Sequence, residues 1–410
     1  MTELDVEFAR SQFPAFSEPS LDGWAFFDNA GGSYACGQVI DRLTAYYRQT
    51  KVQPYNSYPA SAAAGADMDH AYQRLAAWLN VGVDEVHIGP STSQNLYVLA
   101  NAFREMWDDG DQIIVSTQDH EANAGVWRRL ADRGIVVKEW LLDPLTGALD
   151  PADLDELLTD KTRLVALPHC SNIVAAVNPV REIADMAHAY GARLVVDGVS
   201  YAPHGLPDVG ILGADVYLFS TYKTWGPHQG VMTVRRELAD QLGNQSHFFN
   251  SDKIRHKLVP AGPDHAQVAA CAGVVEYLDA IYHHHFGAGP EPSARGRAVH
   301  DLFRDHETEL VARLLTYLGE RDDVRIIGPT EAGARAPTVS VIPRDRSLRE
   351  VASVLADHKV MVGIGHFYGY RPLTAMGIAP QSGVLRMSFL HYTSHDEIDQ
   401  LIAGLEQALA

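Results

Sequence analysis

Short runs of aliphatic and β-branched residues alternate with segments of helical periodicity through the middle of the chain. In one such helical segment, Leu96, Leu99 and Phe103 lie on a single face. Strands separated by helices are typical of a mostly parallel sheet covered by helices. The pattern therefore predicts an α/β protein. The strand-like runs are EVHIG (85–89), QIIVST (112–117), IVVKEWL (135–141), RLVALPH (163–169), ARLVVDG (192–198), VYLFST (216–221) and GVMTVRR (230–236).

The periodicity stops at HHHFGAGPEPSARGRA, residues 283–298, where Gly and Pro interrupt it. Beyond this break the order changes to helix, short strands, helix, strand, helix. We therefore predict a large domain over 20–282 and a small α+β domain formed by 1–19 and 290–410. The three histidines of the break are predicted to be a solvated segment near a hinge rather than a metal site, because adjacent histidines on one turn diverge.

Charge and cysteine content narrow the class of protein. The formal net charge of −19 argues against nucleic-acid or membrane-surface partners. Cys36, Cys170 and Cys271 show no CxxC spacing, so neither a disulfide framework nor a thiolate zinc site is indicated. We find neither a leader-like N-terminus nor an apolar run long enough to span a bilayer, and we expect a cytoplasmic protein.

Polar residues follow several of the predicted strands, where ligands bind in open α/β sheets. Ser91, Thr92 and Ser93 lie between a strand and a helix, a position suited either to a phosphate cradle or to an ordinary hydroxyl cap. His120 follows the next strand and is suited to stacking on a flat ring, or is a solvated turn histidine. Alone, neither segment decides the function.

Three later strand ends carry more specific chemistry. Asn172 lies in HCSN, and Asp197 ends ARLVVDG, where a carboxylate either holds a ligand or terminates the strand by hydrogen bonding. Lys223 follows VYLFST with Ser220 and Tyr222 beside it. A lysine in this place can form a Schiff base with a carbonyl cofactor and then move the Cα proton of a substrate. With pyridoxal 5′-phosphate (PLP), Asp197 would keep the pyridine nitrogen protonated.

Together these segments resemble the class V aminotransferase and cysteine desulfurase family, a branch of the fold-type I PLP-dependent enzymes, through nearly the whole chain. The resemblance also rests on FDNAGGS at 27–33 and LRMS at 385–388. It implies a large domain with a mostly parallel seven-stranded sheet, a smaller α+β domain, PLP as cofactor, and a homodimer with the active site near its interface.

The resemblance also assigns roles to individual residues. Lys223, His120 and Asp197 are the expected catalytic residues, with His120 stacked on the ring and Asp197 on its nitrogen. The remaining cofactor-binding residues are expected to be Ser91, Thr92, Ser93, Asn172, Ser200, Ser220 and Tyr222. The substrate is expected to contact Asn29, Ala30, Gly31, Asn172, His366, Tyr368 and Arg386, the last as the clamp on its carboxylate.

Three positions depart from the family pattern. The segment 365–371, GHFYGYR, lacks the cysteine that desulfurases carry there. Ser200 replaces an expected glutamine, and Pro263 aligns with a phosphate-binding threonine that a partner subunit usually donates. We therefore predict a PLP-dependent lyase or transferase acting at the Cα of a small amino acid, with desulfurase-like carbon–sulfur β-elimination favoured. Class V transamination and amino-acid epimerisation remain alternatives.

Two other classes of function compete with this prediction. Ser220 and Lys223 have the S-x-x-K spacing of penicillin-recognising serine hydrolases, but the motif ends a strand and its usual partner motifs are missing. A catalytically silent protein that keeps the fold to bind a partner is the other alternative. The presence of Lys223, Asp197 and Arg386 counts against it.

Overall fold

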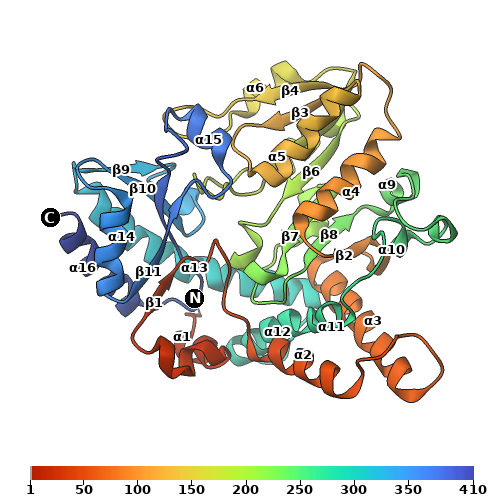
Figure 1. Ribbon diagram of the computed structural model, residues 1–410, viewed down its shortest axis with the longest axis horizontal. Helices are drawn as coiled ribbons and strands as arrows, with labels where there is room; N and C mark the ends of the chain where they lie inside the picture. The colour runs from red at the N-terminus through yellow and green to blue at the C-terminus, as the bar shows by residue number, and fades with distance from the viewer. Residues whose placement is uncertain (1) are drawn as a thin grey trace.

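A seven-stranded sheet forms the middle of the chain in this computed structural model, which describes residues 2–410 (Figure 1). The strand order is β2-β8-β7-β6-β5-β3-β4, and all neighbouring pairs are parallel except those of β8. The predicted α/β fold with seven mostly parallel strands is confirmed. The strands are β2 (Val86–Gly89), β3 (Gln112–Ser116), β4 (Val136–Trp140), β5 (Thr162–Pro168), β6 (Arg193–Asp197), β7 (Val216–Ser220) and β8 (Gly230–Val234).

Helices cover both faces of this sheet. Successive side chains of a strand point to opposite faces, so Leu164 and Ala166 of β5 pack with helices α4 and α5, whereas Val165 and Leu167 face the opposite core. A strand buried on both faces is continuously apolar, as the sequence of β5 is. The helices of this part are α2 (Gly37–Gln49), α3 (Pro59–Leu79), α4 (Thr92–Arg104), α5 (Glu121–Arg128), α6 (Pro151–Leu157), α7 (Val180–Ala189), α8 (Val209–Leu212), α9 (Arg236–Gln241), α10 (Ile254–Lys257), α11 (His265–Ala270) and α12 (Ala272–Phe286).

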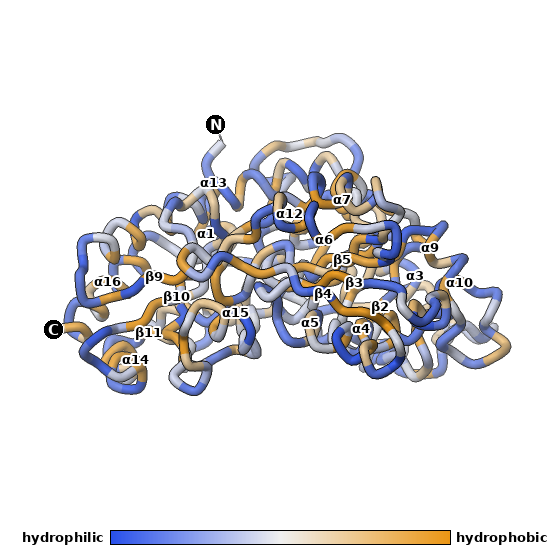
Figure 2. Tube along the Cα trace, turned by 90° about the horizontal axis from the view of Figure 1, so that it is seen from above, coloured by the Kyte–Doolittle hydropathy of each residue, from blue (hydrophilic) through white to orange (hydrophobic). Residues whose placement is uncertain are grey.

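A second sheet of five strands has the order β1-β11-β12-β10-β9. Hydrophobic segments coincide with strands of both sheets, β5 and β11 among them (Figure 2). The first strand of the five-stranded sheet, β1, comes from the N-terminal part of the chain. It pairs in parallel with β11, and Phe26 lies opposite Met361. The elements are α1 (Val6–Ser11), β1 (Ala25–Phe27), α13 (Pro292–Gly319), β9 (Val324–Ile327), β10 (Thr338–Pro343), α14 (Leu348–Asp357), β11 (Val360–Gly365), α15 (Tyr370–Ala375), β12 (Val384–Ser388) and α16 (His395–Ala408).

The pairing of β1 brings the segment after it against the C-terminal strands. Asp28 forms a parallel bridge with Ser388, and the backbone N–H of Asn29 donates to the carbonyl of Ser388 at 3.2 Å. The division of the chain into domains at 20–282 and 290–410 stays a prediction. Residues 25–27, which that division places in the large domain, belong to the same sheet as the C-terminal strands.

The histidine run is exposed at His283 and His284, as expected of a solvated segment, but it does not break the helix as predicted. His283 and His285 continue α12, which ends at Phe286. The His285 ring pairs with the carbonyl of Ile281 at 2.8 Å, and the His283 ring pairs with that of Gly287 at 2.8 Å. These side chains bind carbonyls at the end of the helix, a stabilising role that sequence periodicity alone does not reveal. Within residues 2–410, no helix combines the length and the apolar content needed to cross a bilayer.

Candidate active site

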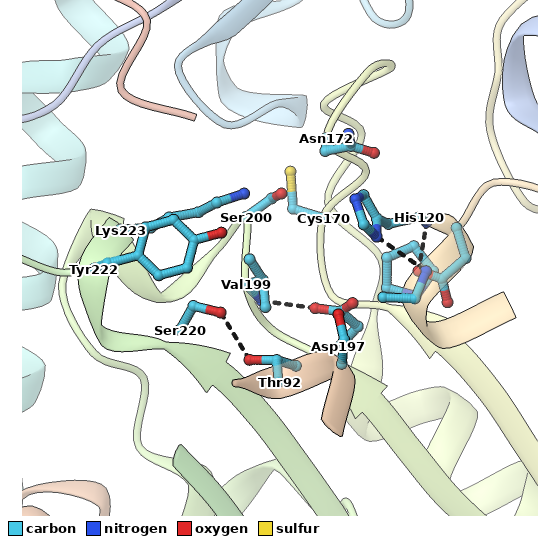
Figure 3. A pocket seen from close by; sticks show the side chains of 14 residues that line it. Thr92, His120, Cys170, Asn172, Asp197, Val199, Ser200, Ser220, Tyr222 and Lys223 are labelled. Carbon is cyan, nitrogen blue, oxygen red and sulfur yellow. Dashed lines mark hydrogen bonds between the residues drawn. The ribbon is translucent and has the colours of Figure 1, made fainter. Parts of the chain in front are cut away.

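The ends of β5, β6 and β7 and the first turn of α4 surround one pocket (Figure 3). Lys223, Tyr222 and Ser220 come from the segment that ends and follows β7, and Asp197 ends β6. The pocket thus gathers most of the cofactor-binding residues that the sequence predicts. Its lining includes Thr92, Ser93, Asp119, His120, Cys170, Asn172, Asp197, Ser200, Ser220, Tyr222 and Lys223.

Lys223 is the amine of this pocket, in a short 3₁₀ turn directly after β7. Burial, with a smaller contribution from the nearby Arg386, lowers the pKa of Lys223 to about 8 against the opposing effect of Asp197. Desolvation and a neighbouring cation both disfavour the charged ammonium. At pH 7 about a tenth of Lys223 is therefore a neutral, nucleophilic amine, far more than for a lysine of ordinary pKa.

Asp197 faces the same pocket from the end of β6 and is 5% exposed. Burial raises the pKa of Asp197 to about 6, although the N–H of Val199, which donates to its Oδ1 at 2.9 Å, and the charge of Lys223 lower it. Asp197 remains mostly ionised at neutral pH. Asp119 is also buried here, and burial together with the charge of Asp197 holds the pKa of Asp119 well above its usual range. The site therefore accommodates one carboxylate charge more easily than two.

His120 begins α5 and is a neutral imidazole. Its Nδ1 accepts a hydrogen bond from the N–H of Ala122 at 3.1 Å. Burial lowers the pKa of His120 to about 3, and the charges of Lys223 and Arg386 contribute. A neutral, half-buried ring in the pocket wall is suited to stacking on a planar ligand.

The first turn of α4 forms the polar end of the pocket. The hydroxyls of Thr92 and Ser220 lie 2.7 Å apart, and Ser93 lines the pocket beside them. A Cβ on Gly230 would lie 2.3 Å from the backbone of Ser91, so a glycine is needed for β8 to approach this turn. The free N–H groups of a helix start and these hydroxyls suit an anion.

Arg386 lies on β12 in the wider vestibule that contains Lys223. It is 2% exposed, and its guanidinium lies 3.2 Å from Oδ1 of Asp28 and 3.7 Å from the centre of the Phe367 ring. Asn172 connects the two regions, because it lines both and its Nδ2 donates to the carbonyl of Phe367 at 2.8 Å. Ala30, Gly31 and Tyr368 also line the vestibule.

Four residues singled out in the sequence are placed elsewhere. The Asn29 amide binds the carbonyls of Phe26 and Ser388 and the hydroxyl of Tyr392, so its hydrogen bonds are used within the protein. The Ser91 hydroxyl caps α4 by accepting from the N–H of Gln94. His366 lines a neighbouring groove, and Pro263 lines another beside β2 and α4.

Three residues of the site were missed from the sequence. Asp28 pairs with Arg386 across 358 positions, a contact that only the pairing of β1 with the second sheet explains. Phe367 covers Arg386 from the segment 365–371, in which only His366 and Tyr368 were expected to contact the substrate. Asp119 directly precedes His120, and its place after a strand was an available signal.

The hydrolase alternative finds no support in this geometry. Ser220 ends a strand, and its hydroxyl is paired with Thr92 at 2.7 Å. A serine nucleophile of the S-x-x-K type opens a helix and is activated by its lysine.

The α/β architecture, with a lysine after β7 and an aspartate ending β6, is that of the fold-type I class. A cysteine desulfurase structure from Thermococcus onnurineus NA1 matches with a TM-score of 0.85 and 23% identity, covering 100% of this chain and 99% of that one.

Sequence comparison then identifies the family. The family model for aminotransferase class-V matches residues 25–284 and 299–401. The aminotransferase-like protein FGM3 of Gibberella zeae is 36% identical over 100% of this chain and 99% of its own length. The cysteine desulfurase-like protein ustD of Aspergillus flavus is 30% identical over 98% of this chain and 90% of its own length. The chain belongs to the class-V aminotransferase family, and it is a PLP-dependent enzyme.

Proposed function

We propose that this enzyme binds PLP at Lys223 and acts at the Cα of an amino acid, with carbon–sulfur β-elimination as the favoured reaction. The observation that supports it best is the gathering of an amine, a carboxylate and a hydroxyl-lined helix start around one pocket. A shared fold with desulfurases does not by itself identify the reaction, so the proposal depends on these groups.

The residues of the pocket fit PLP. The Oδ1 of Asn172 is buried and has no hydrogen-bond partner among the residues that the structure describes, so it can accept from the ring hydroxyl. Asp197 suits a protonated pyridine nitrogen, and Thr92, Ser93, Ser220 and Tyr222 suit the phosphate. Ser200 takes a place in the same wall. A buried polar atom without a partner is costly unless a ligand satisfies it.

Each residue has a defined task in the proposed reaction. When bound, PLP supplies a carbonyl that condenses with amines and a ring that withdraws electrons from the substrate Cα. Lys223 Nζ removes the Cα proton, for which a pKa of about 8 is well matched to neutral pH. Asp197 holds a proton at the ring nitrogen, and His120 fixes the plane of the ring. Arg386 orients the substrate carboxylate by paired hydrogen bonds.

The proposed elimination leaves sulfur without a protein carrier. The segment 365–371 contains no cysteine, and Cys36, Cys170 and Cys271 are all buried. Cys170 lines the pocket, but burial raises the pKa of its thiol to about 12, so it remains an unreactive thiol. Loss of the Cα proton and of the β-sulfur group, followed by hydrolysis, would release pyruvate, ammonia and a thiol.

A panel of L-cysteine, L-cystine, S-substituted cysteines and common α-amino acids tests the proposed reaction. The holoenzyme is mixed with each, and pyruvate, sulfide or thiol, alanine, keto acids and D-amino acids are quantified. Stoichiometric pyruvate and thiol support elimination. Keto acid without pyruvate indicates transamination and D-amino acid indicates epimerisation, and either result rejects elimination.

We also propose that the enzyme is a cytoplasmic homodimer with each active site near the interface, as is implied by the family. Pro263 has no hydroxyl to donate to the phosphate of a PLP molecule bound in the partner subunit. The phosphate would therefore depend on the α4 turn and Tyr222 of its own subunit.

A further inference from the structure

A second hollow, which we call the side groove, borders the vestibule. The two hollows share Glu121 and Tyr368, so the groove continues directly from the space that contains Lys223 and Arg386. Its volume is about 660 Å³, within the range of sites that hold small-molecule ligands. This is far more space than the side chain of cysteine occupies.

The walls of the side groove are largely apolar. Leu141 is 58% exposed, Tyr368 68% and Tyr370 44%, and all three line this one concavity. Large apolar side chains that are exposed together mark binding surfaces, whereas single ones are ordinary. The clustering therefore indicates an apolar or aromatic ligand group.

The acidic and guanidinium side chains that line the side groove are each held in an ion pair. Glu121 pairs with Arg371 at 3.0 Å, and Glu139 pairs with Arg128 at 2.8 Å. A charged ligand group would have to compete with one of these pairs. The groove thus favours an uncharged group.

The chain segment between the side groove and the vestibule has an unusual backbone conformation. Phe367 and Tyr368 have φ values of +46° and +57°, which non-glycine residues rarely adopt. The N–H of Glu121 donates to the Tyr368 carbonyl at 3.0 Å, and Asn172 holds the Phe367 carbonyl. Such strain persists where surrounding contacts enforce it, commonly at ligand sites. Tyr368 is thereby held at the boundary of the two hollows.

We infer that the side groove receives the side-chain substituent of the amino-acid substrate, and that this substituent is bulky, uncharged and apolar or aromatic. The inference rests on the proposed function, because it takes the substrate carboxylate to be held by Arg386 and its Cα to lie at Lys223. The substrate class is then an amino acid such as an S-aralkyl cysteine, and the groove selects it over cysteine itself.

The test compares S-benzyl-L-cysteine with L-cysteine on the holoenzyme. We expect kcat/KM to be at least tenfold higher for S-benzyl-L-cysteine. Leu141→Arg places a charge in the groove, and Thr374→Trp, on the exposed side of α15, fills it. Each variant is expected to reduce the preference for S-benzyl-L-cysteine at least tenfold. Ile211→Arg is the matched control, because Ile211 is 56% exposed and lies outside the groove, and it should leave the preference unchanged.

The half-saturating concentration for the change in the cofactor absorption band gives a second readout. It should rise at least tenfold for S-benzyl-L-cysteine in both groove variants. A response to L-cysteine combined with no preference, or with a preference that both variants retain, overturns the groove assignment while the proposed function stands. No response to either compound overturns the groove assignment, and no turnover of any compound in the panel described above overturns the proposed function with it.

Discussion

At the scale of single residues, the candidate site depends on how burial shifts the pKa values of a basic and an acidic side chain, Lys223 and Asp197. The same desolvation that lowers the pKa of Lys223 to about 8 raises that of Asp197 to about 6. At pH 7 Asp197 is then mostly a carboxylate, while about a tenth of Lys223 is a neutral amine. A fully exposed lysine, with a pKa of about 10.4, would be almost entirely protonated at this pH.

The pKa of Lys223 predicts how the apoprotein takes up PLP. Only the neutral amine attacks a carbonyl, so below pH 8 the uptake rate should rise about tenfold for each pH unit and level off above it. Stopped-flow absorbance after mixing apoprotein with PLP measures this rate. A rate that keeps rising to pH 10, as for an exposed lysine, contradicts the assignment.

Asp197→Asn tests the carboxylate. The amide cannot hold a proton on the pyridine nitrogen, so kcat should fall about 100-fold or more while PLP remains bound. Steady-state rates together with the cofactor absorption of the purified variant measure both effects. Asp143→Asn, at an exposed turn, is the control and should match the wild type. If kcat of Asp197→Asn equals that of the wild type, Asp197 does not act by keeping the pyridine nitrogen protonated.

At the scale of elements, local periodicity predicted the strands of the large sheet because most of them are apolar on both faces and bounded by polar residues, the edge strand β4 with Lys138 and Glu139 being the exception. The same reasoning placed Lys223 and Asp197 at strand ends. It did not predict that residues 25–27 join β11, because a partner more than 300 positions away leaves no local pattern. Asp28 and Phe367 were missed for this reason, since their contact with Arg386 exists only after the second sheet forms.

Strand β2 contains a buried histidine that should make the fold sensitive to acid. Neither ring nitrogen of His87 has a hydrogen-bond partner among the described residues, and burial lowers its pKa to about 4 from the usual 6.5. Between these values the unfolded chain binds the proton that the folded chain rejects, so the free energy of unfolding falls as the pH drops from 6.5 towards 4. At pH 5 the loss attributable to His87 is about 2 kcal/mol.

His87→Leu should remove this loss. Urea unfolding at pH 7 and pH 5 should show a smaller difference between the two conditions in the variant than in the wild type, by about 2 kcal/mol. His247→Leu, a substitution of an exposed histidine before α10, is the control and should keep the wild-type difference. An unchanged difference in His87→Leu means that the ring is already protonated, or hydrated, in the folded protein.

At the scale of the whole molecule, the surface carries apolar groups that a single chain leaves in water. Phe248 is 85% exposed and Phe249 58% exposed on the segment before α10. Exposed aromatic groups of this kind are common in interfaces between subunits. They agree with the proposed homodimer.

Sedimentation velocity tests the proposed assembly. We expect a species of twice the 44.9 kDa chain mass at micromolar concentration, and Phe248→Ser combined with Phe249→Ser should shift it towards the monomer. A wild-type enzyme that is monomeric and fully active at every concentration contradicts both the dimer and the placement of the active site near its interface.

The central claim is that Lys223 holds PLP, and borohydride reduction tests it most directly. The holoenzyme is reduced, digested and mapped by mass spectrometry, with Lys223→Ala treated in parallel. A pyridoxyl group on the peptide that contains Lys223, absent from the variant, is the predicted result. A pyridoxyl group on another lysine, or on none, contradicts the account.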